Sequence, residues 1–152
     1  MKAKDIMQKD VLTLRVDDDL DIVDNVMALG RIRHLPIVDR HERLVGILTQ
    51  RDLLRASVAS VFGLRRSTER EWLAGIPVRQ VMSSDVTSVR PDAELAEVVD
   101  LMVRKKFGCL PVVEDGRLVG LVTETDCLLC LRDLLASKAE PAATERDADL
   151  EC

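Results

Sequence analysis

The stretch that decides the fold is LVGILTQRD, residues 44–52, because the chain contains it twice. The second copy is LVGLVTETD, residues 118–126. In both copies an apolar run with a central glycine reaches a threonine, and an aspartate follows three residues later. This pattern predicts a buried strand that leads directly into a helix.

The repeat extends well beyond this stretch. Residues 6–39 align with residues 81–114 at an offset of 75, and after a one-residue deletion in the second copy the offset becomes 74. The alignment holds 18 identities in about 49 positions, far more than chance supplies, so the chain is an internal duplication. The identical positions of the first copy are Met7, Asp10, Val11, Arg15, Asp17, Leu20, Val23, Met27, Leu35, Pro36, Val38, Arg43, Leu44, Val45, Gly46, Thr49, Asp52 and Leu54.

Each copy predicts the same order of elements, β-α-β-β-α, and so an α/β (α+β) fold. Apolar residues at helical spacing predict a first helix after the caps offered by Asp17–Asp19, and after Pro91–Asp92 in the second copy. We expect prolines at the start of the second strands, where a missing N–H is tolerated. The expected strands are 10–16, 35–38 and 44–48, then 85–89, 110–113 and 118–122; the last helices run from 50 to about 60 and from 124 to about 137.

The duplication also divides the chain. We expect a first motif at residues 1–55, a partly helical linker at 56–78, a second motif at 79–137 and a mobile tail at 138–152. One copy alone has a small core, so the two should pack sheet to sheet with pseudo-twofold symmetry into one module.

Composition excludes several classes of protein. The chain of 152 residues has a net charge of −5 and 2% aromatic residues, which argues against nucleic acid as a partner. The N-terminus lacks the apolar core of a signal peptide, and no apolar run is long enough to span a bilayer. We therefore expect a cytoplasmic protein without a membrane partner.

The parts of an enzyme are missing from the sequence. There are two histidines, no nucleophile beside an evident base, and no phosphate-binding glycine loop, so we expect no catalytic residue. Cys127 and Cys130 form a C-x-x-C inside an expected helix, which favours buried packing over redox chemistry. No set of ligands completes a metal site, and no cofactor is obligatory.

Both copies resemble the CBS motif. The matching segments are 6–7, 33–39 and 44–52 in the first copy, and 81–82, 109–113 and 118–126 in the second; the two copies and their linker cover about 130 residues. The resemblance implies a tandem CBS pair, or Bateman module, of a stand-alone CBS domain-containing protein. Such modules bind AMP, ATP or another adenosyl ligand in clefts and regulate a partner protein, which the sequence does not name.

The chemistry of Thr49 and Asp52, and of Thr123 and Asp126, fits such a ligand. Threonine at a helix N-cap and aspartate three residues later also make a capping box, which is the structural alternative. The functional interpretation adds a phosphate at the helix N-terminus and a ribose whose hydroxyls donate to the aspartate. The preceding Gly46 and Gly120 would permit close approach of the ligand or backbone.

The resemblance also supplies the other residues of the clefts. Arg33 and His34 are expected to face phosphate, or else to be a solvated charge pair, whereas Gly108 and Cys109 at the matching places carry no charge. The two clefts should therefore be unequal, and Cys109 is read as a packing residue rather than a reactive thiol. The remaining expected site residues are the adenine walls Val11, Ile32 and Val86, for which core packing is the alternative, and the prolines Pro36 and Pro111.

The sequence thus predicts a regulatory module that senses an adenine nucleotide as a homodimer. An alternative is a structural or oligomerisation module with empty clefts; others are a binder of S-adenosylmethionine, of NAD or of nucleic acid. The apolar residues expected to support the dimer or the linker are Val58, Val61, Phe62 and Leu64.

Overall fold

The computed structural model describes residues 1–63 and 75–139. The linker interior at 64–74, Leu64 included, and the tail from residue 140, including Cys152, lie outside the described residues, as do the side chains of Val61 and Phe62. The elements in chain order are α1 (Ala3–Ile6), β1 (Leu14–Arg15), α2 (Leu20–Gly30), β2 (His34–Val38), β3 (Leu44–Thr49), α3 (Gln50–Gly63), the 3-10 helix η1 (Val78–Gln80), α5 (Leu95–Lys105), β4 (Cys109–Glu114), β5 (Arg117–Thr123) and α6 (Glu124–Ala139).

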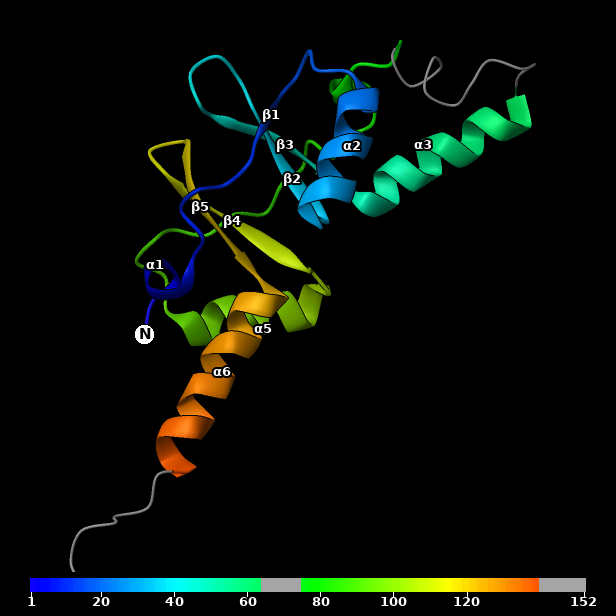
Figure 1. The fold of residues 1–152 in the computed structure, drawn as a ribbon. Helices are drawn as coiled ribbons and strands as arrows, with labels where there is room; N and C mark the ends of the chain where they lie inside the picture. Colours follow the sequence, from blue (N-terminus) through cyan, green and yellow to red (C-terminus); the bar gives the residue numbers. More distant parts are fainter. Residues whose placement is uncertain (64–74, 140–152) are drawn as a thin grey trace, which may run out of the picture.

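The two motifs each carry a sheet, two helices and a core of their own, which confirms the α+β class (Figure 1). The first sheet has the order β1-β2-β3, and the second pairs β4 with β5. Apolar side chains of β1, β2, β3, α2, α3 and η1 fill the first core, and those of β4, β5 and α5, with Ala3 of α1, fill the second. The antiparallel register matches between motifs, since Pro36 lies opposite Ile47 and Pro111 opposite Leu121.

The first strand of each motif is much shorter than the sequence predicts. Residues 10–16 yield only Leu14–Arg15, and residues 85–89 yield a single bridge between Val89 and Val112. The prolines explain this correction, because they lie inside β2 and β4 and not at the strand starts. Val89 donates its N–H to the carbonyl of Pro111, but proline has no N–H to extend the ladder further. Parallel pairing therefore begins only beyond each proline.

Two short segments exchange places between the motifs, and we call residues 1–8 and 76–83 the crossed segments. The first carries α1, which Figure 1 shows beside α5 and α6 of the second motif. Ala3 is fully buried there, and Gln8 exchanges backbone hydrogen bonds of 2.9 and 3.0 Å with Leu121. The second crossed segment mirrors this arrangement in the first motif, where Ser83 exchanges two bonds of 2.9 Å with Ile47.

The crossed segments also provide backbone acceptors for the first N–H groups of α2 and α5. The first N–H of α2, on Leu20, donates to the carbonyl of Ile76, and the first N–H of α5, on Leu95, donates to the carbonyl of Met1. Asp19, the N-cap residue of α2, makes no side-chain cap. The expected aspartate cap is thus replaced by a backbone carbonyl from the crossed segment, which satisfies the same orphan donor.

The two sheets contact each other at both ends. At the hairpin end, Leu44 donates its N–H to Gly116 and Leu118 donates its N–H to Glu42. At the other end, the imidazole of His34 at the start of β2 lies against Gly108, just before β4. The two motifs therefore meet sheet to sheet, as the small size of each core predicts.

Candidate functional site

Thr49 and Asp52 form a reciprocal capping box where β3 passes into α3. The backbone N–H and the hydroxyl of Thr49 donate to Oδ2 of Asp52 at 2.8 and 2.9 Å, and the N–H of Asp52 donates to the Thr49 hydroxyl oxygen at 3.2 Å. The structural alternative is therefore present. It occupies only one carboxylate oxygen, and among residues 1–63 and 75–139 no group donates to Oδ1 of Asp52. That oxygen retains the capacity to accept a hydrogen bond.

Thr123 and Asp126 repeat the box at the start of α6, with one added contact. The corresponding distances are 2.8, 2.6 and 3.3 Å. Here the side-chain amide of Gln8 donates to Oδ1 of Asp126 at 2.9 Å. Asp126 is 8% exposed, whereas Asp52 is only half-buried. Both oxygens of the second carboxylate are thus engaged within the protein.

The paired glycines make room for methionines of the crossed segments. A Cβ on Gly120 would lie 2.5 Å from Sδ of Met7 and 3.0 Å from the carbonyl oxygen of Gln8. A Cβ on Gly46 would collide with Met82, whose Cγ it would approach to 3.0 Å. Close approach does require these glycines, but the approaching group in the structure is a thioether side chain.

His34 lies at the boundary between the motifs. Its Cε1 and Nε2 would each stand 3.0 Å from a Cβ on Gly108. Burial lowers the pKa of His34, and Arg33 lowers it further, while Glu124 of the second motif and Asp52 oppose the shift. Burial thus favours the neutral imidazole, and Arg33, which is exposed, carries the fixed positive charge of the pair. His34 therefore contacts both motifs and does not belong to the first cleft alone.

The remaining expected site residues are apolar, and most of them are at least half-buried. Val11, Ile32 and Val86 are half-buried, and Ile32 packs against the first core, so part of each side chain serves packing. Pro36 and Pro111 are buried inside their sheets. Their roles as ligand contacts stay predictions.

The cysteines behave as packing or surface residues and carry no disulfide among the described ones. Cys109 is buried, and burial raises the pKa of its thiol to about 12, so thiolate chemistry is suppressed at neutral pH. Cys127 and Cys130 lie on the expected helix, α6, but the burial predicted for them is only partial.

A pocket of about 430 Å³ opens beside Asp126, between α1 and α6. Ile6, Leu129 and Leu134 give it apolar walls, and the Sγ of Cys130 contacts the Sδ of Met1 at 3.3 Å on its rim. Of the expected site residues, only Asp126 lines this pocket.

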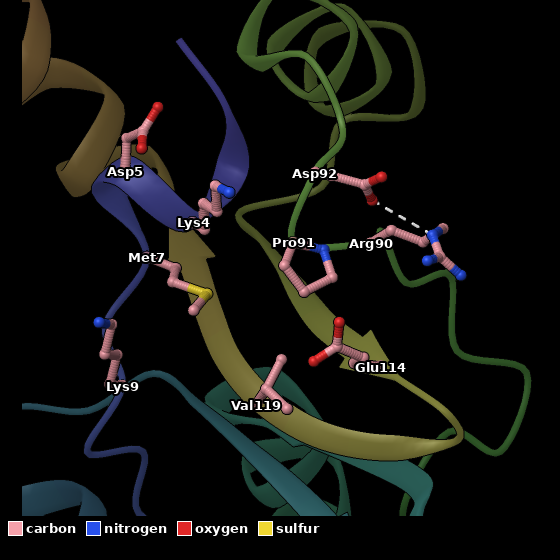
Figure 2. Close-up of a pocket in the computed structure, with 9 residues that line it drawn as sticks. All are labelled: Lys4, Asp5, Met7, Lys9, Arg90, Pro91, Asp92, Glu114 and Val119. Carbon is pink, nitrogen blue, oxygen red and sulfur yellow. Dashed lines mark hydrogen bonds and ion pairs between the residues drawn. The ribbon is translucent and has the colours of Figure 1, made fainter.

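A larger cavity of about 550 Å³ was not predicted. Figure 2 shows it between the first crossed segment and residues 90–92, above β4 and β5. Its charged lining is mixed: Lys4, Asp5 and Lys9 lie on one side, and Arg90, Asp92 and Glu114 lie on the other. None of the expected site residues lines it.

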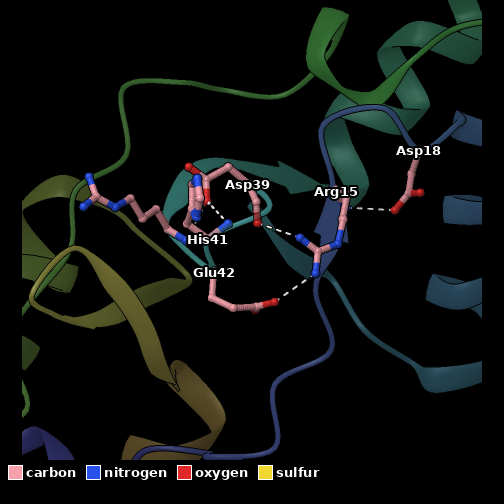
Figure 3. Close-up of polar contacts among 6 residues, drawn as sticks. Arg15, Asp18, Asp39, His41 and Glu42 are labelled. Carbon is pink, nitrogen blue, oxygen red and sulfur yellow. Dashed lines mark hydrogen bonds and ion pairs between the residues drawn. The ribbon is translucent and has the colours of Figure 1, made fainter.

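In the first motif Arg15, the counterpart of Arg90, is bound to the hairpin between β2 and β3. Arg15 donates to the carbonyl of Asp39 at 2.7 Å and to Glu42 at 2.9 Å (Figure 3). The second hairpin is one residue shorter, and Arg90 instead turns to Asp92 at 3.2 Å. The deletion seen in the repeat alignment therefore coincides with a different partner for this arginine, at the edge of the cavity.

Two kinds of feature are absent from the described residues. Residues 1–63 and 75–139 contain no cluster of three or more His, Cys, Asp or Glu side chains arranged to hold a metal ion. In the same part of the chain no helix has both the length and the apolar character needed to cross a membrane.

Comparison with known proteins gives a consistent match. The chain is 34% identical over 93% of its length to the inosine-5'-monophosphate dehydrogenase of Methanocaldococcus jannaschii, of which it spans only 24%. Among solved structures, AcuB from Vibrio cholerae matches with a TM-score of 0.82 and 37% identity, covering 92% of this chain and 98% of that one.

A second solved structure contains ligands. The CBS domain pair of protein MJ0100, solved with 5'-methylthioadenosine and S-adenosyl-L-methionine, matches with a TM-score of 0.71 and 27% identity over 91% of this chain and 98% of that one. The CBS domain model itself matches residues 3–59 and 78–133, in agreement with the two copies of the repeat. The chain therefore belongs to the CBS domain family and is a tandem CBS domain pair.

Proposed function

We propose that this CBS pair is a regulatory module that binds an adenine nucleotide in its clefts and passes the signal to a partner protein. The observation that carries the proposal is the carboxylate of Asp52. It is fixed by Thr49 at the N-terminus of α3, half-buried, and has one oxygen without a donor in the described part of the chain. A ribose hydroxyl provides the missing donor.

The surroundings of Asp52 suit the rest of such a ligand. The N-terminus of α3 attracts phosphate through its free N–H groups and dipole. Arg33 lies on the same side of the motif, because its carbonyl accepts the first N–H of α3, on Gln50, at 2.9 Å. Ile32 and Val11 provide apolar surface for a base. The ligands of MJ0100 share the adenosine group, which supports the adenosyl class.

A ligand panel tests the proposal. AMP, ADP, ATP, S-adenosylmethionine, NAD and adenosine should be compared by thermal shift, with GMP and CMP as controls for the base. We expect at least one adenine nucleotide to raise the melting temperature in a concentration-dependent way, since a ligand that binds only the folded state stabilises it. An unchanged melting temperature across the panel, confirmed by calorimetry, would contradict the proposal.

We further propose that a second copy of the chain is a partner. On α6 the side chains of Leu128, Leu131 and Leu135 form a stripe at helical spacing, and each is roughly half or more exposed. On α3, Leu54 and Val58 are also exposed. A twofold contact between such helices buries apolar surface on both copies at once.

Light scattering at tens of micromolar tests the dimer. We expect twice the mass of the chain, and a monomer from the variant Leu131→Glu, because a glutamate in the stripe leaves a charge buried at the interface. The matched control is Arg132→Glu, beside the stripe, which should remain dimeric. A monomeric parent protein would rule out this arrangement.

A further inference from the structure

The two motifs differ at the carboxylate that each presents to a ligand. Oδ1 of Asp126 accepts the amide N–H of Gln8 at 2.9 Å, and this side chain covers an aspartate that is 8% exposed. The internal repeat places Ser83 at the position of Gln8. Ser83 has the same backbone pairing, to Ile47, but its side chain is too short to reach Asp52 as Gln8 reaches Asp126.

We propose that Gln8 is a specificity-determining residue that closes the second cleft to a ribose diol, so that the Asp52 cleft is the adenosine site of the chain. The inference rests on the proposed function and assigns one of its two clefts. Because Gln8 occupies Oδ1 of an aspartate that is only 8% exposed, a ribose hydroxyl entering the second cleft competes with the Gln8 amide for this oxygen. When the hydroxyl replaces the amide, the Asp126 carboxylate gains one charge-assisted hydrogen bond and loses another, so that the net gain in binding free energy is small. In the first cleft no such exchange is needed.

The exposure of Gln8 makes this contact removable without loss of the fold. Its side chain is exposed, and its backbone hydrogen bonds to Leu121 do not depend on the side chain. The variant Gln8→Ser gives the second motif the residue of the first, and Ser83→Gln gives the first motif the residue of the second. Each motif thereby serves as the control for the other.

Calorimetry with AMP is the test, with Asp52→Ala and Asp126→Ala to assign each cleft. We expect the parent chain to bind one AMP tightly, at the Asp52 cleft. Gln8→Ser should strengthen the second site by about tenfold, as expected for an unopposed hydrogen bond to a carboxylate, and adding Asp126→Ala should cancel the gain. Ser83→Gln should weaken the first site by about tenfold.

A ligand without the diol isolates the contact. The affinity for 2',3'-dideoxyadenosine should not change in Gln8→Ser. Two equal AMP sites in the parent, or a second site that Gln8→Ser leaves unaltered, would overturn the inference while the proposed function stands. If neither the parent nor the variants bind any adenine nucleotide of the panel, both fall together.

Discussion

Replacing Asp52 by alanine should weaken AMP binding by roughly tenfold or more, whereas Asp126→Ala should cost much less. A hydrogen bond to a charged group contributes about 1.5–3 kcal/mol, and Asp52 has a carboxylate oxygen to offer that Asp126 has already committed to Gln8. Calorimetry on both variants, with AMP and with adenosine, measures the difference. Because Arg33 belongs to the same motif as Asp52, Asp52→Ala should also remove most of the preference for AMP over adenosine.

The capping role of both aspartates needs a control. Each accepts two hydrogen bonds from its threonine, so alanine also removes a helix cap, at a cost of about 0.5–2 kcal/mol of stability. Asp52→Asn keeps an oxygen for Thr49 while placing an amide donor at the ligand, which separates the two roles. Equal losses of AMP affinity from Asp52→Ala and Asp126→Ala would show that the two clefts are equivalent.

Gly120→Val should be among the most damaging single substitutions in the chain. The new side chain would collide with Met7 and with the carbonyl oxygen of Gln8, and that carbonyl is fixed by its hydrogen bond from Leu121. Overpacking of this kind costs about 1–3 kcal/mol, and we expect the upper end of that range. Urea unfolding, read as the midpoint at constant slope, gives the measurement.

Gly46→Val is the matched comparison. The three atoms nearest to its Cβ all belong to the flexible side chain of Met82, which can move aside, so the loss should fall at the lower end of the same range. The double variant Gly120→Ala with Met7→Ala should recover part of the stability that Gly120→Ala loses. Equal stability of Gly120→Val and the parent would mean that the crossed segment does not pack as described.

The order of elements could be predicted because it depends on local sequence patterns that occur in both copies of the repeat. Helical spacing after Leu20 and after Leu95, and apolar runs ending at Thr49 and Thr123, place helices and strands close to where they lie. The length of the first strands could not be predicted in the same way. The length depends on whether the edge of β2 or β4 that lacks the proline N–H is the edge that pairs with the first strand. That can be known only once the neighbouring strand has been placed.

The candidate site was predicted in its local part and missed in its long-range part. Thr49 with Asp52, and Thr123 with Asp126, are close in sequence, and their hydrogen bonds follow from the spacing. Gln8 contacts Asp126 across 118 positions of the chain, and His34 contacts Gly108 across the pseudo-twofold axis. The difference between Gln8 and Ser83 is visible in the repeat alignment. Its effect on the two aspartates follows only from the exchange of the crossed segments, which places Gln8 beside Asp126.

That exchange constrains how the molecule assembles during synthesis. The first eight residues leave the ribosome early, yet Ala3 and Gln8 acquire their partners, Ala93 and Leu121, only when the second half of the chain has emerged. Such non-local pairing is slow to form and leaves apolar surface uncovered in the meantime. Neither repeat therefore contains all of its own packing partners. Cutting the gene between the copies would give each fragment a terminal segment that belongs to the other.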